Sequence, residues 1–188
     1  MKKQIVTAVL YTVVTAVLVG IVYPLAVTGV AQLLFPKQSN GELITRDGNL
    51  IGSELIGQPF SGPGYFHSRP SAAGTGYDAA SSSGSNLAPT SKTLIDRTRA
   101  SVTTEQGSGS GPVPVDLVTA SASGLDPDIS PAAAEYQVAR VAAQRKLPVA
   151  TVQSLVQQHI TERQLGLLGE ARVNVLELNL ALDVVTKK

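Results

Sequence analysis

The sequence contains no cysteine and no tryptophan, and aromatic residues make up only 4% of its 188 positions. Without cysteine the chain forms no disulfide and offers no thiolate to zinc or to an iron–sulfur cluster. Lysine and arginine number 15 against 14 aspartates and glutamates, so the chain lacks the excess positive charge typical of nucleic-acid-binding proteins. This length allows one small domain beside a membrane segment, and packing alone must stabilise that domain.

Charge is also missing from a long stretch near the N-terminus, because no residue between Lys3 and Lys37 is charged. A bilayer core about 30 Å thick requires roughly 20 apolar residues in a helix. The pattern therefore predicts a transmembrane helix over about 5–30, with 32–36 emerging into the interface. A cleaved signal peptide has a shorter apolar region and a small-x-small cleavage site, so we expect an uncleaved anchor.

The lysines beside this segment predict its orientation. Lys2 and Lys3 lie before the apolar stretch, and positive charges favour the cytoplasmic side of a membrane. We therefore expect a cytoplasmic N-terminus, an anchor at 1–36 and an extracytoplasmic accessory domain at 37–188.

Small or kinking residues recur every four positions along the apolar stretch. A face of small residues lets a second membrane helix approach closely, and a proline removes one backbone hydrogen bond and bends the helix. The stripe predicts a lateral partner, although an inert anchor remains the alternative. Its members are Ala8, Thr12, Ala16, Gly20, Pro24 and Thr28.

Beyond the membrane segment the sequence predicts a single α+β domain with a small sheet and several helices. A hairpin is expected over 40–58 around the turn signal Asp47-Gly48. Residues 61–91 are predicted to form an ordered loop packed on the domain, since a flexible linker rarely carries so many aromatic and charged side chains. A short helix is expected over 90–104, followed by a Gly/Ser connection at 106–111.

Helix signals are stronger in the C-terminal part. Ser130-Pro131 combines an N-cap with proline at the first helical position and predicts a helix over 131–146. Pro148 opens a second helix over 149–160. Asn174 and Glu177 resemble a capping box, so we favour a third helix over 175–185, where alternating apolar positions also fit a strand.

No self-contained catalytic site is visible. His67 and His159 lie far apart in sequence, and a metal site requires three or four ligands, so we expect neither to bind a metal. The chain contains neither a Gly-x-Ser-x-Gly elbow nor a phosphate-binding loop. The tract 83–86 is more typical of a turn than of an anion cradle. Asp126 and Asp128 are expected to form turns and caps rather than a pair of catalytic carboxylates.

Six segments in order along the chain carry a family resemblance. They are the apolar anchor, the strings 58–60 and 65–71, the string 84–89, the string 123–131, and the string 168–176. With these segments the chain resembles the C subunit of the Kdp-type potassium-transporting P-type ATPase. The motif residues, whose roles the resemblance leaves open, are Tyr65, Phe66, His67, Arg69, Pro70, Ser71, Gly84, Ser85, Asn86, Asp126, Pro127, Gly169, Glu170, Arg172 and Asn174. The chain departs from the family at Ala171, where proline is usual, and at Asp128, where histidine is often found.

The resemblance implies a pump in the bacterial inner membrane with three partner subunits. These are a potassium-channel-like subunit, a P-type subunit that hydrolyses ATP, and a small single-helix subunit. ATP, magnesium and potassium then belong to the complex, and this chain is expected to bind no cofactor by itself and no nucleic acid.

Two accounts of the C subunit follow from the resemblance. It either caps the channel-like subunit on the external face, or acts as a catalytic chaperone that raises the ATP affinity of the hydrolysing subunit. The predicted orientation favours the cap. A secreted enzyme and a solitary membrane-tethered binding domain are the alternatives outside the family.

Overall fold

The protein is described here by a computed structural model that covers residues 1–107, 109 and 111–186. The chain divides into two compact units, residues 1–50 and the residues from Ile51 onward. Both helices and short strands occur, so the predicted α+β class is confirmed.

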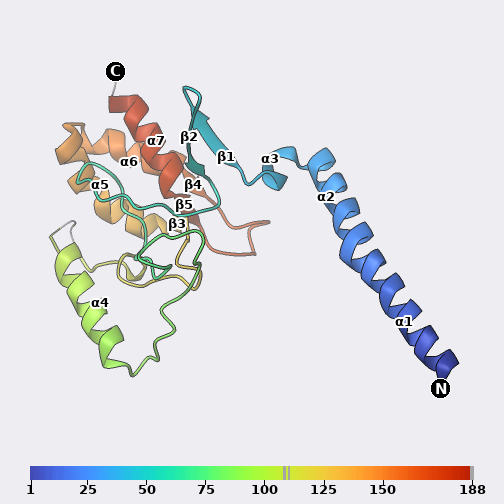
Figure 1. The fold of residues 1–188 in the computed structure, drawn as a ribbon. Helices are drawn as coiled ribbons and strands as arrows, with labels where there is room; N and C mark the ends of the chain where they lie inside the picture. Colours follow the sequence, from blue (N-terminus) through green and yellow to red (C-terminus); the bar gives the residue numbers. More distant parts are fainter. Residues whose placement is uncertain (108, 110, 187–188) are drawn as a thin grey trace. The chain divides into compact units, whose positions relative to one another are not determined.

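Unit 1 begins with an unbroken run of helix. Helix α1 spans Lys2–Val17, a π-helical turn spans Leu18–Val22, and α2 spans Tyr23–Leu34 (Figure 1). The combined helix of 33 residues is long and apolar enough to cross a membrane, and no part of its most apolar window is buried within the chain. Length and composition thus make it the one candidate membrane span among the described residues.

The π-helical turn lies immediately before Pro24. Proline has no N–H, so the carbonyl of Gly20 cannot receive its usual α-helical hydrogen bond. The N–H of Tyr23 donates to the carbonyl of Leu18, one residue further back than in an α-helix. The helix therefore continues past the proline by widening one turn, a feature that often marks a kink or a functional position.

The predicted hairpin follows the helix. After the short helix α3, Pro36–Ser39, strands β1, Leu43–Arg46, and β2, Asn49–Ser53, pair with each other. Asp47 and Gly48 between them have φ angles of 52° and 78°. Two consecutive positive φ values define the tight turn that this residue pair favours, so the prediction is confirmed.

Three helices form most of the C-terminal part of unit 2. Helix α5 spans Pro131–Arg145 and begins as predicted, because the Ser130 side chain accepts a hydrogen bond from the N–H of Ala133. It ends at Lys146 with a φ of 55°, where the N–H of Leu147 bonds back to Ala142. Helix α6 spans Val149–Gln158, two residues shorter than predicted.

The third predicted helix is also present. Helix α7 spans Val175–Thr186, and the N–H of Glu177 donates to the Asn174 side chain at 3.1 Å. This cap decides in favour of the helix at a place where the apolar alternation also fitted a strand. Helices α5, α6 and α7 contact one another in sequence order.

A three-stranded antiparallel sheet lies beside these helices, so the small sheet is confirmed, although the positions of its strands were not predicted. Its order is β3, Asp128–Ile129, then β5, Arg172–Asn174, then β4, Ile160–Thr161. Ile129 and Ile160 both register against Val173 of the central strand. The core between sheet and helices is mostly aliphatic, with Phe66 as its one fully buried aromatic residue among those described.

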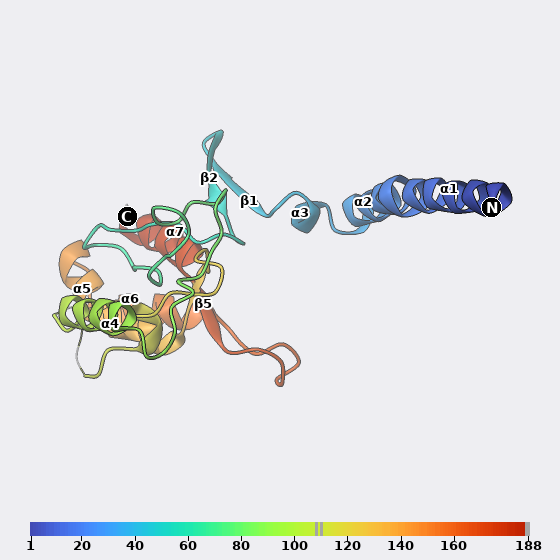
Figure 2. The same cartoon turned by 60° about the horizontal axis from the view of Figure 1, so that its bottom comes forward.

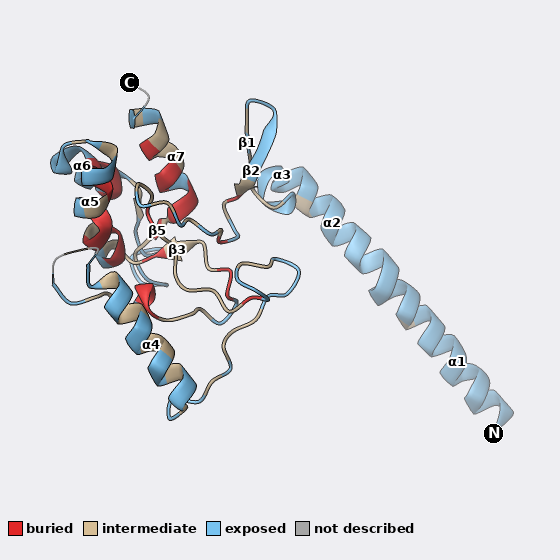
Figure 3. Ribbon diagram, turned by 60° about the vertical axis from the view of Figure 1, so that its left-hand side comes forward, coloured by how far each residue is buried: buried red, intermediate tan, exposed pale blue. Residues whose placement is uncertain are grey.

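The remaining chain between β2 and α5 contains little regular structure. Helix α4 spans Lys92–Glu105, as predicted, and has no buried residue (Figure 3). Residues 54–90 form no helix or strand, yet Phe66 and Ala73 are fully buried, which confirms a loop packed on the domain. The predicted connection at 106–111 includes residues 108 and 110, which lie outside the described part.

Candidate functional site

The motif loop 62–71 is fastened to the helices by two buried side-chain amides. Asn179 on α7 accepts from the N–H of Phe66 at 2.9 Å and donates to the carbonyl of Phe66 at 2.9 Å. Gln137 on α5 does the same for His67, at 2.7 and 3.2 Å. Both amides are almost completely buried, so they satisfy loop backbone groups that have no strand to pair with.

Two arginines on α5 also bind backbone carbonyls of the loop. Arg140 on α5 donates to the carbonyl oxygens of Pro63 and Tyr65, at 2.6 and 3.0 Å, and to the Gln137 side chain. Arg145, one turn and a half further along, donates to the carbonyl of Gly64 at 2.7 Å. Guanidinium groups suit this task because they offer five donors in a fixed plane.

Arg145 also joins the loop to α7. Its guanidinium lies 4.3 Å from the centre of the Tyr65 ring and forms an ion pair of 2.9 Å with Asp183. The Tyr65 hydroxyl donates to the same aspartate at 3.3 Å. The loop, α5 and α7 therefore meet at one network of a cation, a carboxylate and an aromatic ring.

Burial changes the acid–base properties of this network. It lowers the pKa of the His67 imidazole below its ordinary value, and the positive charge of Arg140 lowers it further. The His67 Nε2 atom lies 3.1 Å from the carbonyl of Gly62, a contact that offsets part of this shift. Burial likewise lowers the pKa of the Arg140 guanidinium.

The next part of the loop contacts the segment 121–126. Arg69 forms an ion pair of 2.8 Å with Asp126, and the Ser71 hydroxyl donates to the carbonyl of Gly124 at 2.6 Å. Ser71 also accepts from the N–H of Tyr77, whose hydroxyl donates to the carbonyl of Arg69. Burial raises the pKa of the Tyr77 hydroxyl. These contacts close the loop into a compact unit.

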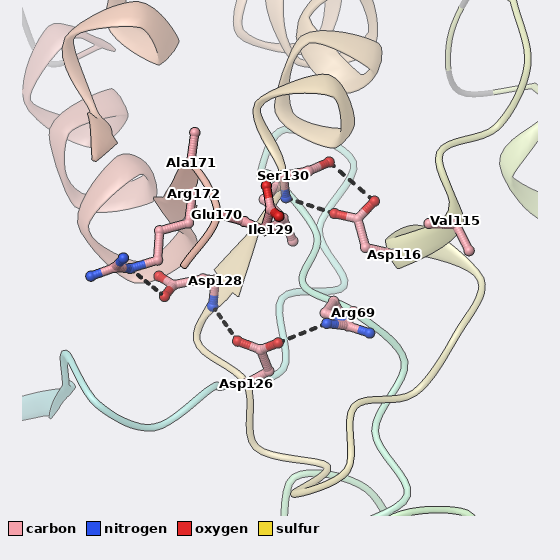
Figure 4. Close-up of a pocket in the computed structure, with 10 residues that line it drawn as sticks. All are labelled: Arg69, Val115, Asp116, Asp126, Asp128, Ile129, Ser130, Glu170, Ala171 and Arg172. Carbon is pink, nitrogen blue, oxygen red and sulfur yellow. Dashed lines mark hydrogen bonds and ion pairs between the residues drawn. The ribbon is translucent and has the colours of Figure 1, made fainter. Parts of the chain in front are cut away.

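A cleft of about 400 Å³ lies beside Arg69, between the segment 115–130 and the start of β5 (Figure 4). Its charged residues are paired with neighbours: Asp126 with Arg69, and Asp128 with Arg172 at 3.1 Å. Asp116 accepts from the N–H and the hydroxyl of Ser130. Burial raises the pKa of the Asp128 carboxyl, and the charge of Arg172 opposes this shift.

Asp126 forms a turn as predicted, whereas Asp128 lies in β3 and its carboxylate pairs with Arg172. The second oxygen of Asp126 accepts from the N–H of Asp128 at 3.1 Å, which makes a local turn. Asp128 and Ala171, the two positions at which the chain departs from the resembled family, both line the cleft.

A second cleft of about 550 Å³ separates the motif loop from α4. Its lining combines cationic side chains with hydroxyl groups and one carboxylate. The main polar members are His67, Arg69, Tyr77, Arg97, Thr104 and Glu105. Such a lining can hold a small anionic group, although the carboxylate of Glu105 opposes this.

The other motif residues lie away from these clefts or serve turns. Gly84 packs against the carbonyl of Ala122, where a Cβ would approach to 2.9 Å. Asn86 has a φ of 51°, and Gly169 one of 76°. The tract 83–86 is tied to the backbone of Ser123 by a hydrogen bond from Ser83 at 2.9 Å. The tract 83–86 therefore packs against the segment around Ser123.

Several remaining motif residues fix strands and loops. The carbonyl of Pro127 accepts from the N–H of Val175 at 3.0 Å, and Asn174 donates to the carbonyl of Glu54 at 2.8 Å. Glu170 pairs with Arg163. The two histidines are in different places, since His67 is in the loop and His159 ends α6. Among the described residues no group of three potential ligands is arranged to hold a metal ion.

The predicted helix-packing stripe is fully exposed. All six of its residues are accessible, and no atom outside the helix comes within 4 Å of a Cβ built on Gly20. The stripe therefore remains a prediction about a partner that this single chain does not contain.

The sequence patterns did not point to the residues that make most of the hydrogen bonds to the motif loop. Gln137, Arg140 and Asn179 were not singled out, although a signal existed for two of them. Gln137 lies between Ala134 and Val141 on the apolar face of α5, and Asn179 lies between Leu176 and Leu182 on that of α7. A long polar side chain on a buried helical face must find a partner.

The sequence can be compared with those of known proteins. The family model described as "KdpC: K+-transporting ATPase, c chain" matches residues 5–184. The chain belongs to this family. A relative from Acidobacterium capsulatum is 63% identical over 177 residues, which cover 94% of this chain and 96% of the relative. One from Koribacter versatilis is 57% identical over 184 residues, covering 97% and 95%.

A relative from Rhodospirillum rubrum is 58% identical over 169 residues, which cover 88% of each chain. All three relatives are named potassium-transporting ATPase KdpC subunit. The family resemblance read from the motifs is therefore confirmed, and the matched region includes the apolar helix, the motif loop and the sheet.

Proposed function

We propose that this chain is a non-catalytic accessory subunit of an ATP-driven potassium uptake pump. Its helix Lys2–Leu34 is the anchor in the bacterial inner membrane, and the residues from 37 onward lie outside the cytoplasm. There the domain caps the channel-like subunit and stabilises its assembly with the ATP-hydrolysing subunit and the small single-helix subunit. ATP, magnesium and potassium are bound by the complex rather than by this chain.

The observation that carries this proposal is the use of the motif residues. Polar groups of the loop 62–71 are engaged by α5, α7 and the segment 121–126 through Asn179, Gln137, Arg140 and Arg69. A catalytic site needs polar groups that remain available to a substrate. Residues engaged in this way instead support a rigid surface, which is what a structural subunit requires.

The charge pattern supports the external location. Lys2 and Lys3 lie at the N-terminal end of the candidate span, and such residues are retained on the cytoplasmic side. A domain outside the cytoplasm has no access to cytoplasmic ATP. This separation favours a cap over a direct part in hydrolysis.

Topology fusions and a deletion test the proposal. A C-terminal alkaline phosphatase fusion should be active in a bacterial host, and a C-terminal fluorescent-protein fusion that folds only in the cytoplasm should be dark. Deleting the chain should abolish potassium-stimulated ATP hydrolysis by the purified pump and reduce co-purification of its other subunits. The reverse fusion pattern, or a pump that assembles and turns over normally without the chain, would contradict the cap.

A catalytic chaperone is the second candidate function. The cleft beside α4 favours it, because Arg69, Arg97 and His67 line a space of about 550 Å³ together with hydroxyl groups. In that account the chain raises the ATP affinity of the hydrolysing subunit. An ATP titration of the purified chain separates the two accounts.

A further inference from the structure

The loop between β4 and β5 carries a cluster of exposed leucines. Leu165 is 90% exposed, Leu167 82% and Leu168 59%. The loop projects from the rest of unit 2 in both views (Figures 1 and 2). Apolar residues gathered on one projecting surface mark a site of contact with a protein or a membrane.

This leucine loop, residues 162–170, is held in shape by its own hydrogen bonds. Gln164 and Leu168 exchange two backbone hydrogen bonds, both of 2.9 Å, and the N–H of Gly166 donates to the carbonyl of Arg163 at 3.0 Å. An ion pair between Arg163 and Glu170 closes its base. A loop that is already ordered loses little conformational freedom on binding.

The residues at the tip are unusual for an exposed turn. Leu165 has a φ of 54°, a left-handed conformation that asparagine, aspartate and glycine adopt far more readily. The hydrogen bonds that close the turn are formed by the backbone, so polar side chains at Leu167 and Leu168 would be compatible with the same turn. Neither the backbone geometry of the turn nor packing within the chain accounts for these leucines, which points to a contact outside the chain.

We propose that the leucine loop inserts into an apolar pocket on another subunit of the pump. This inference rests on the proposed function. The loop does not suit a bilayer surface, because residues 160–171 contain one arginine against two glutamates and no aromatic residue. Membrane-surface segments rely on basic and aromatic side chains. A rigid, uncharged leucine tip instead matches the central anchor of a protein interface, which is buried in a pocket of the partner.

The first test changes the tip in the full-length chain expressed with its partner subunits. Leu165→Asn with Leu167→Gln makes the tip polar, and asparagine suits the positive φ of residue 165. Leu55→Gln with Val149→Gln is the matched control, since both residues are 53% exposed elsewhere in unit 2. Recovery of the other subunits with the tagged chain in mild detergent should fall about tenfold or more for the tip variant only.

The outcomes separate the inference from the proposed function. If the wild-type chain and the tip variant recover the other subunits equally well, the leucine loop is not the contact, and the proposed function stands. If the wild-type chain recovers none of them, the proposed function fails and the inference fails with it. Unchanged thermal melting of the isolated tip variant by circular dichroism shows that the loss is not one of folding.

The second test identifies the occupant and needs no loss of binding. The chain has no cysteine, so Leu167→Cys gives one site for an environment-sensitive fluorophore. Emission should shift to the blue in the assembled pump and not in the full-length chain alone, in nanodiscs of phosphatidylethanolamine and phosphatidylglycerol. A shift in the chain alone would identify the bilayer as the occupant and overturn the inference, as would the absence of a shift in both samples.

Discussion

Gln137 and Asn179 provide the loop with the pairing that a neighbouring strand provides in a sheet. Each amide offers one acceptor and one donor, and each meets the N–H and the carbonyl of a single loop residue. Because both amides are buried, these bonds form away from competing water. Removing one amide would leave buried backbone groups unpaired, which costs more than the bonds contribute on average.

Replacing Asn179 with leucine tests this at the residue scale. Asn179→Leu keeps the branching and the number of heavy atoms of the side chain but leaves the N–H and carbonyl of Phe66 without partners, each at a cost of about 1–3 kcal/mol. We expect the free energy of unfolding to fall by roughly 2–4 kcal/mol, measured by urea denaturation of the full-length chain in mild detergent. Gln158→Leu, an exposed amide on α6, is the control. Equal midpoints for wild type and Asn179→Leu would show that the loop does not need the amide.

His67 gives this loop a predictable response to pH. Its folded-state pKa is lowered below the ordinary value of 6.5, so the folded state favours the neutral ring. The stabilisation is fully present above pH 6.5 and is lost as pH falls through the lower folded-state pKa. The melting temperature of the wild type should therefore decrease more steeply between pH 7 and pH 5 than that of His67→Gln. Parallel pH profiles for the two proteins would contradict this.

At the scale of elements, α5 and α7 both contribute to the hydrophobic core and bind the motif loop. Their apolar residues form the core, while Gln137, Arg140 and Arg145 on α5, and Asn179 and Asp183 on α7, hold the loop. The cap at Ser130 and the left-handed end at Lys146 fix the length of α5. The loop is thus positioned by helices whose own ends are well defined.

The apolar helix has a surface that this chain does not cover. Its stripe of small residues passes through the π-helical turn at Leu18–Val22, next to Pro24. A locally widened turn changes the direction of the side chains that follow it. The stripe and the turn together favour a specific lateral partner over an inert anchor.

Bulky substitutions on the stripe test this at the element scale. Ala16→Leu with Gly20→Leu places branched side chains where a neighbouring helix is expected to approach, and the added hydrophobicity leaves membrane insertion intact. We expect a loss of co-purification with the other subunits of at least several-fold. Val14→Leu with Val22→Leu adds bulk to the opposite face and should have little effect. If both variants co-purify like the wild type, this face is not the contact.

At the scale of the whole molecule, several charged groups of unit 2 pair with one another. Arg69, Arg145 and Arg172 pair with Asp126, Asp183 and Asp128. Arg97 lines the cleft beside α4 together with Arg69 and His67. This cleft is where a nucleotide would have to bind if the chain acted as a catalytic chaperone.

The purified chain should therefore show no ATPase activity and no tight ATP binding. It has no phosphate-binding loop, and each aspartate of the first cleft already has a partner. Isothermal calorimetry or a fluorescent nucleotide titration should reveal no saturable binding at low micromolar ATP. Saturable binding that is lost in Arg97→Gln, or on alteration of residues 83–86 or 157–158, would favour the catalytic chaperone over the cap.

The sequence by itself determined the features that depend on neighbouring residues. The long uncharged stretch predicts the apolar helix, Asp47-Gly48 the hairpin turn, and Ser130-Pro131 the start of α5, because each signal acts within a few residues. The motif strings were also enough to assign the family. Orientation in the membrane and the role of the stripe remain predictions.

Only the tertiary structure decided how distant segments pair. The strands β3, β4 and β5 have two or three residues each, too few for a periodic pattern, and Asp128 registers against Asn174 far along the chain. The pairing of Asn179 with Phe66 is equally remote in sequence. Such contacts depend on where the packed core brings two segments together, and that follows from the whole chain rather than from any window of it.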